Sequence, residues 1–455
     1  AVRLYRPWDA EAFLAALPES ARRIAVLDRT KEPGAPGEPL LQDVSLTLGE
    51  HAGRAGSAMP LVIGGRYGLS SKEFVPAHAA AAFAELARDD PRPRFTLGIT
   101  DDVTRLSLDP VPGVGGEPES VRRLVFYGLG SDGTVGANKN TIKIISDETG
   151  SHAQGYFVYD SKKSGSITVS HLRFAPEPIS SSYLIHDADF VSCSQFGFLR
   201  QFDVLGCAGE GATVLLDSPY EADRVWDLLP RAVQETVVAK RLDVRAIDAH
   251  AIARETGLGQ RINTVMQAAA FALLRIMPPE RALERIRESI RRTYGKRGES
   301  VVTRNTRAAE LAFDRVERVP TPEEATSEIG VGRVVPADAP DFVRRVTDAL
   351  MRGEGELLPV SAMPPDGTFP TATAKYEKRG IAQDIPIWEP DLCIQCGLCS
   401  LVCPHAAIRV KSFDEPRTAG APAGFKHAPG RGADFKGKRV TVQVAKRVRR
   451  QAPGV

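Results

Sequence analysis

Four of the six cysteines fall within one short run near the C-terminal end of the sequence. They are Cys393, Cys396, Cys399 and Cys403, spaced C-x2-C-x2-C-x3-C and followed directly by Pro404. This spacing is typical of the bacterial ferredoxin loop, in which cysteine thiolates hold the iron ions of a 4Fe-4S cluster. We therefore predict that these four cysteines are metal ligands and that the cofactor is a 4Fe-4S cluster.

Two other interpretations of the cysteine run remain open, namely a zinc site and inert thiols. Zinc sites usually pair two separated C-x2-C units, whereas this run is continuous. In two-cluster ferredoxins the fourth cysteine ligates the other cluster, and the sequence holds no second run of this kind. Cys403 therefore either folds back onto the first cluster or belongs to a ferredoxin module that is incomplete in this chain.

Cysteine usage also indicates a cellular compartment. Disulfide frameworks spread cysteines through short secreted chains, whereas one tight cluster in a chain of 455 residues indicates metal binding in a reducing environment. We therefore expect a cytoplasmic protein. The two isolated cysteines, Cys193 and Cys207, lie among apolar or small residues and are predicted to be buried and inert.

A glycine-rich loop is the second feature that could do chemistry. The strand expected at 123–127 runs directly into the sequence GLGSDGTVGANK at 128–139. Glycines let backbone N–H groups approach a phosphate closely, and the N-terminus of a following helix favours an anion. Lys162 and Lys163 follow another expected strand and would suit a highly phosphorylated ligand. The alternative is a tight glycine turn with a solvated lysine pair, and His171 is predicted to be structural.

Overall charge and hydrophobicity exclude several classes of protein. Charged residues make up 25% and hydrophobic residues 42% of the chain, so sizeable cores can form. A net charge of +2 argues against a polyanion-binding chain, and the basic tail at 446–450 lacks interleaved aromatic residues. No apolar run reaches the roughly 18 residues of a membrane span. We expect neither a nucleic acid nor a membrane as a partner.

Strand and helix signals alternate along most of the chain, which predicts an α/β fold. Strands are expected at 23–27, 60–63, 95–99, 123–127, 155–159, 166–170, 182–185, 213–216 and 244–247. Helices are expected at about 72–88, 262–276, 279–294 and 340–351. The predicted fold class is two parallel-sheet α/β domains, followed by a linker arm and a partial bacterial-ferredoxin-like α+β module.

Shifts in composition divide the chain into five segments. Stretches rich in proline and glycine separate the two α/β domains and mark the linking segment. The predicted boundaries are 1–112 and 119–319 for the α/β domains, 320–384 for the linking segment, 385–445 for the partial ferredoxin module and 446–455 for an atypical basic tail.

Several longer stretches occur in an order that is hard to obtain by chance. They are LDRTKEPGAPGEP at 27–39, GGRYGLSSK at 64–72, FYGLGSDGTVGANK at 126–139, GYFVYDSKK at 155–163, YEKRG at 376–380 and the cysteine run. With these stretches the sequence resembles the single-chain pyruvate:ferredoxin (flavodoxin) oxidoreductases, up to about Ala445. The resemblance implies that 1–112 is the C-terminal part of a transketolase C-terminal-like domain. It also implies that 119–319 contacts coenzyme A and that 320–384 carries the EKR motif.

The resemblance implies an enzyme that converts pyruvate, coenzyme A and oxidised ferredoxin to acetyl-CoA, CO2 and reduced ferredoxin. This chain would contribute coenzyme A binding and iron–sulfur electron transfer. The residues carried over as coenzyme A contacts are Gly130, Ser131, Asp132, Gly133, Thr134, Lys162, Asn263 and Asn305. No catalytic acid or base is identified in the chain.

Further cofactors and partners follow from the same resemblance. Thiamine diphosphate and Mg²⁺ would act in the full enzyme, bound mainly by segments that the chain lacks. Ferredoxin or flavodoxin would accept the electrons, the missing pyruvate- and thiamine-binding domains would be partners, and the full enzyme would be a homodimer. The chain is therefore expected to be incomplete and inactive alone. The alternatives are another 2-oxoacid:ferredoxin oxidoreductase, or an inactive fragment that binds coenzyme A or a nucleotide without turnover.

Overall fold

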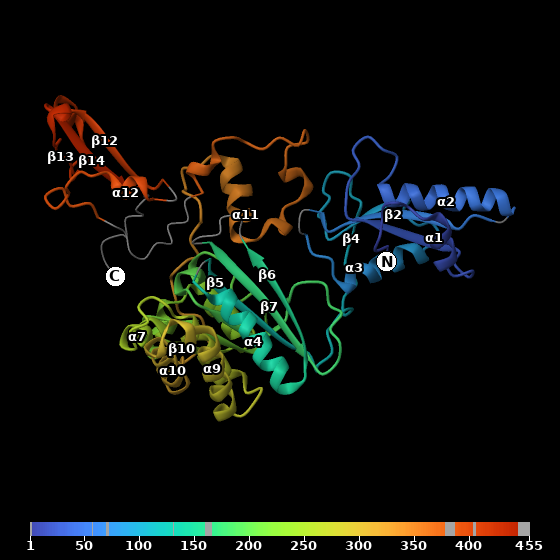
Figure 1. The fold of residues 1–455 in the computed structure, drawn as a ribbon. Helices are drawn as coiled ribbons and strands as arrows, with labels where there is room; N and C mark the ends of the chain where they lie inside the picture. The colour runs from blue at the N-terminus through green and yellow to red at the C-terminus, as the bar shows by residue number, and fades with distance from the viewer. Residues whose placement is uncertain are drawn as a thin grey trace. The chain divides into compact units, whose positions relative to one another are not determined.

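The computed structural model describes residues 2–56, 58–69, 72–130, 132–159, 166–377, 387–403 and 406–444 (Figure 1). The chain forms two compact units, Ala1–Glu377 and Lys378–Val455. The first unit contains two sheets with their helices, and the second contains one small sheet. Within the described ranges, no helix is both long enough and apolar enough to cross a membrane.

The first sheet consists of four parallel strands in the order β1-β2-β3-β4, as predicted for a parallel α/β domain. Asp28 at the end of the first strand accepts hydrogen bonds from the N–H groups of Leu40 and Leu41, which fixes the start of a helix against the sheet. The helix expected from residue 72 begins instead at Pro76, because proline favours the first helical turn. The elements are α1 (Ala10–Ala16), β1 (Arg23–Asp28), α2 (Pro39–Ala55), β2 (Leu61–Tyr67), α3 (Pro76–Ala87), β3 (Arg94–Leu97) and β4 (Ser107–Leu108).

The second sheet has seven strands in the order β11-β10-β9-β8-β5-β7-β6. The four strands β5, β8, β9 and β10 are parallel to one another. Their bounds are β5 (Arg122–Leu129), β6 (His152–Tyr159), β7 (Ile167–Ala175), β8 (Ala188–Cys193), β9 (Ala208–Asp217), β10 (Asp243–Ile247) and β11 (Glu317–Arg318). The α/β class is thus confirmed, and the central strands have the predicted orientation.

Two strands of this sheet, β7 and β11, run opposite to the others and differ from the expectation of a wholly parallel arrangement. β7 pairs antiparallel with both β5 and β6, and β11 pairs antiparallel with β10. Parallel neighbours need a crossover of roughly a dozen residues or more, and the segment between Tyr159 and Ile167 is too short for one. The sheet is therefore mixed.

The strand expected at 182–185 does not form, and the chain enters the sheet later, at β8. Ile185 is buried, but its N–H group donates to the ring nitrogen Nδ1 of His171 (3.2 Å) rather than to a neighbouring strand. The apolar run at 182–185 correctly predicted that Ile185 is buried. The run did not predict that the N–H of Ile185 bonds to a distant side chain instead of to a neighbouring strand.

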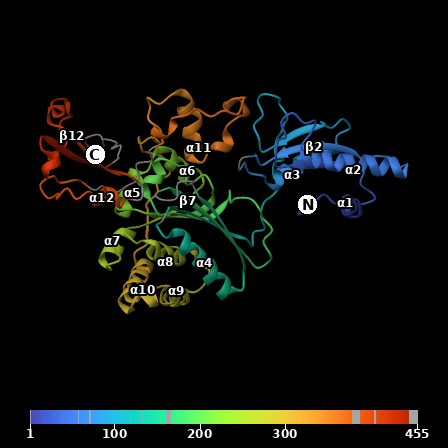
Figure 2. The same ribbon diagram turned by 45° about the horizontal axis from the view of Figure 1, so that its top comes forward.

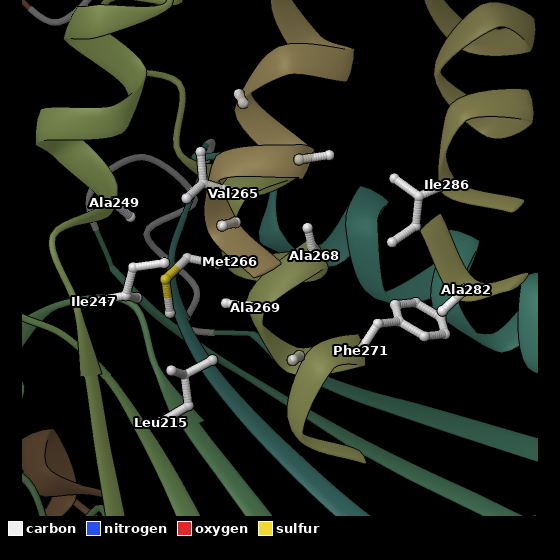
Figure 3. Close-up of a cluster of buried hydrophobic side chains, with 14 of the residues drawn as sticks. Leu215, Ile247, Ala249, Val265, Met266, Ala268, Ala269, Phe271, Ala282 and Ile286 are labelled. Carbon is white, nitrogen blue, oxygen red and sulfur yellow. The ribbon is translucent and has the colours of Figure 1, made fainter. Parts of the chain in front are cut away.

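Helices cover both faces of the second sheet (Figure 2). One face carries α4 (Thr134–Thr149), α7 (Ala249–Glu255), α8 (Asn263–Leu274), α9 (Pro279–Tyr294) and α10 (Glu299–Asp314), followed on α9 by a 3-10 turn (Gly295–Arg297). The other face carries a 3-10 helix (Phe196–Arg200), α5 (Ala222–Leu228) and α6 (Arg231–Ala239). On the first face, Met266 of α8 packs with Leu215 and Ile247 of the strands (Figure 3). The helices expected at 262–276 and 279–294 are confirmed as α8 and α9.

The linking segment has a small core of its own. The carboxylate of Asp348 accepts hydrogen bonds from the N–H groups of Val334 and Val335 (2.9 and 3.1 Å), which folds the preceding chain onto the helix. The core residues are Val334, Val335, Ala339, Val343 and Met351. The elements are a π-helical turn (Val343–Thr347), α11 (Asp348–Arg352) and 3-10 turns at Gly355–Leu357, Val360–Ala362 and Thr373–Lys375.

The second unit contains an antiparallel sheet in the order β12-β14-β13. Its elements are α12 (Leu398–Leu401), β12 (Ile408–Asp414), β13 (Ala428–Pro429), β14 (Lys438–Val444) and 3-10 turns at Glu415–Gly420 and Ala433–Phe435. This small α+β module agrees with the predicted class. The tail predicted at 446–455 lies outside the described residues.

Candidate functional site

The glycine loop lies between β5 and α4. At this point the connections from two neighbouring strands lead to opposite sides of the sheet. From β5 the chain passes through α4 to β6 on one side, whereas from β8, the parallel neighbour of β5, it continues to β9 on the other. Such a switch point opens a crevice at the carboxyl ends of the strands, which is where α/β sheets bind ligands. The structure thus places the loop where a nucleotide-like ligand is expected.

Two glycines are required by close contacts. A Cβ atom on Gly128 would lie 2.6 Å from the Cβ of Thr134, so only glycine lets α4 start this close to β5. Gly133 has φ of +94°, and a Cβ there would lie 3.2 Å from the Cγ of Asn263. Asn263 is distant in the sequence, and the fold brings its side chain beside the loop.

Asp132 holds the loop together from within. Its Oδ2 accepts hydrogen bonds from the N–H of Leu129 (2.7 Å) and the hydroxyl of Thr134 (2.8 Å), and its Oδ1 accepts from the N–H of Thr134 (2.7 Å). Gly133 caps α4 without a side-chain hydrogen bond. The first turn of α4 therefore presents N–H groups with no intrahelical acceptor, while Asp132 acts as the support of the loop.

Asn305 is placed behind the loop rather than in it. The residue is 5% exposed, its Oδ1 accepts from the hydroxyl of Thr264 (2.9 Å), and its Nδ2 donates to the carbonyl of Val301 (2.8 Å). Thr264 follows Asn263 at the start of α8. The structure therefore connects Asn305 to Asn263, and it uses both polar groups of Asn305 inside the protein.

Two predicted contacts, Ser131 and Lys162, lie outside the described residues. The neighbouring chain is tied to the loop, because the N–H of Gly130 donates to the carbonyl of Ser166 (2.6 Å) just before β7. On the other side, Gln267 of α8 donates to the carbonyl of Ala137 (3.1 Å) and so braces α4.

The sequence analysis missed a group of buried polar residues beside the loop. Asn138 of α4 and the residues Ser166, Thr168 and Ser170 are all buried. The alternation of small hydroxyl residues along 166–170 indicates that they share one strand face, but not that a helix covers this face.

The isolated histidine and cysteines have structural environments. His171 accepts a hydrogen bond from Ile185, and burial lowers the pKa of His171 to about 4, so the neutral ring is the stable form. Cys193 is fully buried, and burial raises the pKa of its thiol to about 12. Burial also raises the pKa of Cys207, whose sulfur lies 3.6 Å from the hydroxyl of Tyr127. Cys193 is buried as predicted, Cys207 is only partly buried, and His171 has a structural hydrogen bond.

The four clustered cysteines lie on the loop around α12. The N–H of Gln395, a residue with φ of +61°, donates to the sulfur of Cys393 (3.3 Å), and the Gln395 side chain donates to the carbonyl of Pro429 (2.8 Å). Cys396 and Cys399 are exposed, as an external group would require. Among the described residues, however, no three His, Cys, Asp or Glu side chains are arranged to hold a metal ion. The donor set suits an iron–sulfur cluster by chemistry and spacing, not by the present positions of the sulfurs.

Comparison with protein families gives three matches along the chain. Residues 123–315 match the family described as pyruvate ferredoxin/flavodoxin oxidoreductase. Residues 331–382 match the EKR domain, described as a domain of unknown function. Residues 386–409, which include all four clustered cysteines, match the 4Fe-4S binding domain. This last match supports a 4Fe-4S cluster over zinc.

Curated relatives are similar to almost the whole chain. A pyruvate-flavodoxin oxidoreductase of Rhodospirillum rubrum is 53% identical over 436 residues, which is 95% of this chain and 36% of that protein. The pyruvate-flavodoxin oxidoreductase of Nostoc sp. is 50% identical, covering 98% and 38% of the two chains. The pyruvate:ferredoxin oxidoreductase of Moorella thermoacetica is 46% identical over the same shares. The chain spans a little over a third of the length of these relatives, and over that span it is similar to the pyruvate ferredoxin/flavodoxin oxidoreductases.

Proposed function

We propose that this chain supplies the coenzyme A-binding and electron-transfer part of a pyruvate:ferredoxin or flavodoxin oxidoreductase. The observation that carries this proposal is the glycine loop at the switch point of the second sheet, with Asn263 brought beside Gly133. The overall reaction would convert pyruvate, coenzyme A and oxidised ferredoxin to acetyl-CoA, CO2 and reduced ferredoxin.

The residues of the loop have separate parts in this proposal. The N–H groups of Gly133, Val135 and Gly136 and the positive end of the α4 dipole would bind the pyrophosphate of coenzyme A. The N–H groups of Gly130 and Thr134 hold the loop together, because they donate to Ser166 and Asp132. Lys162 would pair with the 3′-phosphate. The side-chain amide of Asn263, beside the loop, would form a hydrogen bond with the bound coenzyme A. Asp132 and Asn305 would keep the loop and the start of α8 in place, because their polar groups are used internally.

The cysteine run would carry the electrons. Cys393, Cys396, Cys399 and Cys403 would hold a 4Fe-4S cluster, which supplies one-electron transfer to ferredoxin or flavodoxin when bound. The described cysteines form no disulfide, which suits the reducing cytoplasm as the proposed location.

Thiamine diphosphate and Mg²⁺ belong to the proposed activity of the full enzyme. The described residues offer no group of three metal-ligating side chains for a divalent ion, so other parts of the full enzyme would bind the Mg²⁺. We propose that the pyruvate- and thiamine-binding domains of the full homodimeric enzyme complete the reaction.

The coenzyme A proposal is tested by calorimetric titration of the full chain. Replacing Lys162 by alanine should weaken coenzyme A binding about tenfold, the effect of losing one charge-assisted contact. The same variant should bind 3′-dephospho-coenzyme A as well as the wild type does, because the lost partner is then absent from the ligand. Lys296→Ala, in the exposed turn after α9, serves as the matched control. Absence of coenzyme A binding by the wild type would refute the proposal.

A further inference from the structure

The buried face of α4 changes character along the helix. Its buried residues are polar in the first half, at Thr134, Asn138 and Thr141, and apolar in the second half, at Ile144 and Ile145. These positions follow helical spacing, so they lie along one stripe that faces the sheet. The apolar core thus extends under the second half of α4, whereas the half next to the glycine loop rests on polar groups.

The strand beneath α4 changes in the same direction. Leu172 and Phe174 of β7 belong to the core that α4 completes. Side chains two residues apart on a strand share a face, so Ser170, Thr168 and Ser166 continue this face towards the loop. They are 0%, 5% and 3% exposed. Helix and strand therefore bring their polar halves to the same end of the sheet.

The strand register fixes where these hydroxyls lie. Thr168 is directly opposite Gly128 in the ladder between β5 and β7. Gly128 is the residue whose missing Cβ admits Thr134, the first residue of α4. Thr168 is consequently adjacent to the contact that sets α4 on the sheet.

Four polar atoms of this region have no hydrogen-bond partner among the described residues. They are Asn138 Nδ2, Ser166 Oγ, Thr168 Oγ1 and Ser170 Oγ, which we call the polar strip. Farther along the same helix face, Thr141 donates to the carbonyl of Ala137 (3.0 Å) and accepts from Gln267 (3.0 Å). A buried polar group without a hydrogen-bond partner destabilises the fold. Several such groups in one place are typical of a functional site, where proteins give up stability locally.

We propose that the polar strip positions the glycine loop for its ligand by hydrogen-bonding only in the ligand-bound form. When an anion is held by N–H groups at the start of α4, the side chains of Asn138, Thr168 and Ser170 would hydrogen-bond to the loop or to water held beside it. Such a difference between the two forms is what lets a group shift a binding equilibrium. This inference rests on the proposed coenzyme A site and adds residues that act through the loop.

The test replaces one hydroxyl of the strip without changing its shape. Thr168→Val in the full chain should raise Tm by about 2–4 °C, because an unpartnered buried hydroxyl is removed from the ligand-free form. The same variant should bind coenzyme A about 5–10-fold more weakly by titration calorimetry, because the bound form loses a hydrogen bond. Thr168→Ser keeps the hydroxyl and should restore the affinity.

The control is a threonine whose hydroxyl is already satisfied. Thr96 in β3 is 3% exposed and donates to Ser107 (3.3 Å), so Thr96→Val should lower Tm and leave coenzyme A affinity unchanged. Ser170→Ala provides a second strip variant, with the same expected directions as Thr168→Val.

Each outcome decides a different statement. If Thr168→Val and Ser170→Ala lower Tm and bind coenzyme A normally, the strip is ordinary core and the inference is wrong. If the wild type binds coenzyme A but the strip variants do not show both a higher Tm and weaker coenzyme A binding, the proposed function stands and the inference is wrong. If the wild type does not bind at all, both are overturned.

Discussion

The two candidate sites of this chain are built in opposite ways. The cysteine run places all four thiols within residues 393–403, so their spacing alone predicts the ligands. The glycine-loop site draws on β5, α4, β7 and α8, and Asn263 lies far from Gly133 in the sequence. A short-range ligand set can thus be identified without a fold, whereas a long-range set exists only when a sheet and its helices bring it together.

The packing around the two sites differs in the same sense. The glycine loop is backed by a core that includes Phe126, Ile145 and Leu172. Around the cysteine run, Leu392, Leu401 and Ile394 are 83%, 80% and 71% exposed. A metal cluster supplies folding free energy of its own when it binds, so a cysteine loop needs less apolar support than a phosphate loop does.

The largest expected effect tests the local site. Anaerobic reconstitution of the full chain should give a reducible chromophore with iron and sulfide in the ratio of a 4Fe-4S cluster. Cys399→Ser should abolish most of this iron, because one thiolate ligand is lost, while Cys207→Ser should retain it. Metal analysis that found stoichiometric zinc instead would contradict the cluster.

A variant of Cys403 tests whether the fourth cysteine ligates the same cluster as the other three. If Cys403 folds back onto the same cluster, Cys403→Ser should lose iron as severely as Cys399→Ser does. Retention of wild-type iron and absorbance by Cys403→Ser would show that the fourth cysteine does not ligate this cluster.

The next effect tests whether the second site depends on a close approach of helix and strand. Gly128→Ala should destabilise the chain by about 1–3 kcal/mol, because the new Cβ would lie 2.6 Å from Thr134, and it should weaken coenzyme A binding at least tenfold. Gly136→Ala is the matched control: it lies in α4 with no atom within 4 Å of a new Cβ, so it should stabilise the helix by about 0.4–1 kcal/mol. Equal stability of the two variants by denaturant unfolding would contradict this account.

A pH-dependent effect is expected from His171 in the first unit. Burial lowers the folded-state pKa of His171 from 6.5 to about 4, so the unfolded chain binds the proton first. Protonation of His171 therefore favours the unfolded state. The free energy of unfolding is unaffected above pH 6.5 and falls by up to about 3 kcal/mol as the pH drops towards 4. His171→Gln cannot titrate and should flatten this part of the curve of unfolding free energy against pH. An unchanged acid slope would show that His171 does not cause it.

The smallest expected effect tests whether Asn305 holds the start of α8 in place or contacts coenzyme A directly. If Asn305 acts by holding the start of α8, Thr264→Val should weaken coenzyme A binding by the same factor of about two to five as Asn305→Ala, because both break the 2.9 Å hydrogen bond. A strong effect of Asn305→Ala alone, measured by titration, would instead indicate a direct ligand contact.

Periodic patterns in the sequence predicted the regular elements well. The apolar stripe of α9 predicted its bounds, Pro279–Tyr294, because one helix face must be buried wherever the helix packs. The expected strand at 182–185 failed, because the N–H of Ile185 is satisfied by His171 instead of by a strand. The polar strip was also missed, because a Ser-x-Thr-x-Ser alternation predicts an exposed strand face until a helix is known to cover it.

The sequence by itself determined the α/β class, the glycine loop, the cysteine spacing and the resemblance to a family, since each depends on residue types at short spacing. Only the tertiary structure decided that β6 and β7 run antiparallel, that Asn263 meets Gly133 and that Asn305 supports α8 from behind. It also decided that the hydroxyls of Thr168 and Ser170 lie beneath α4 with no hydrogen-bond partner among the described residues. Short spacings are set by chain geometry, whereas these contacts arise when separate elements bury one common core.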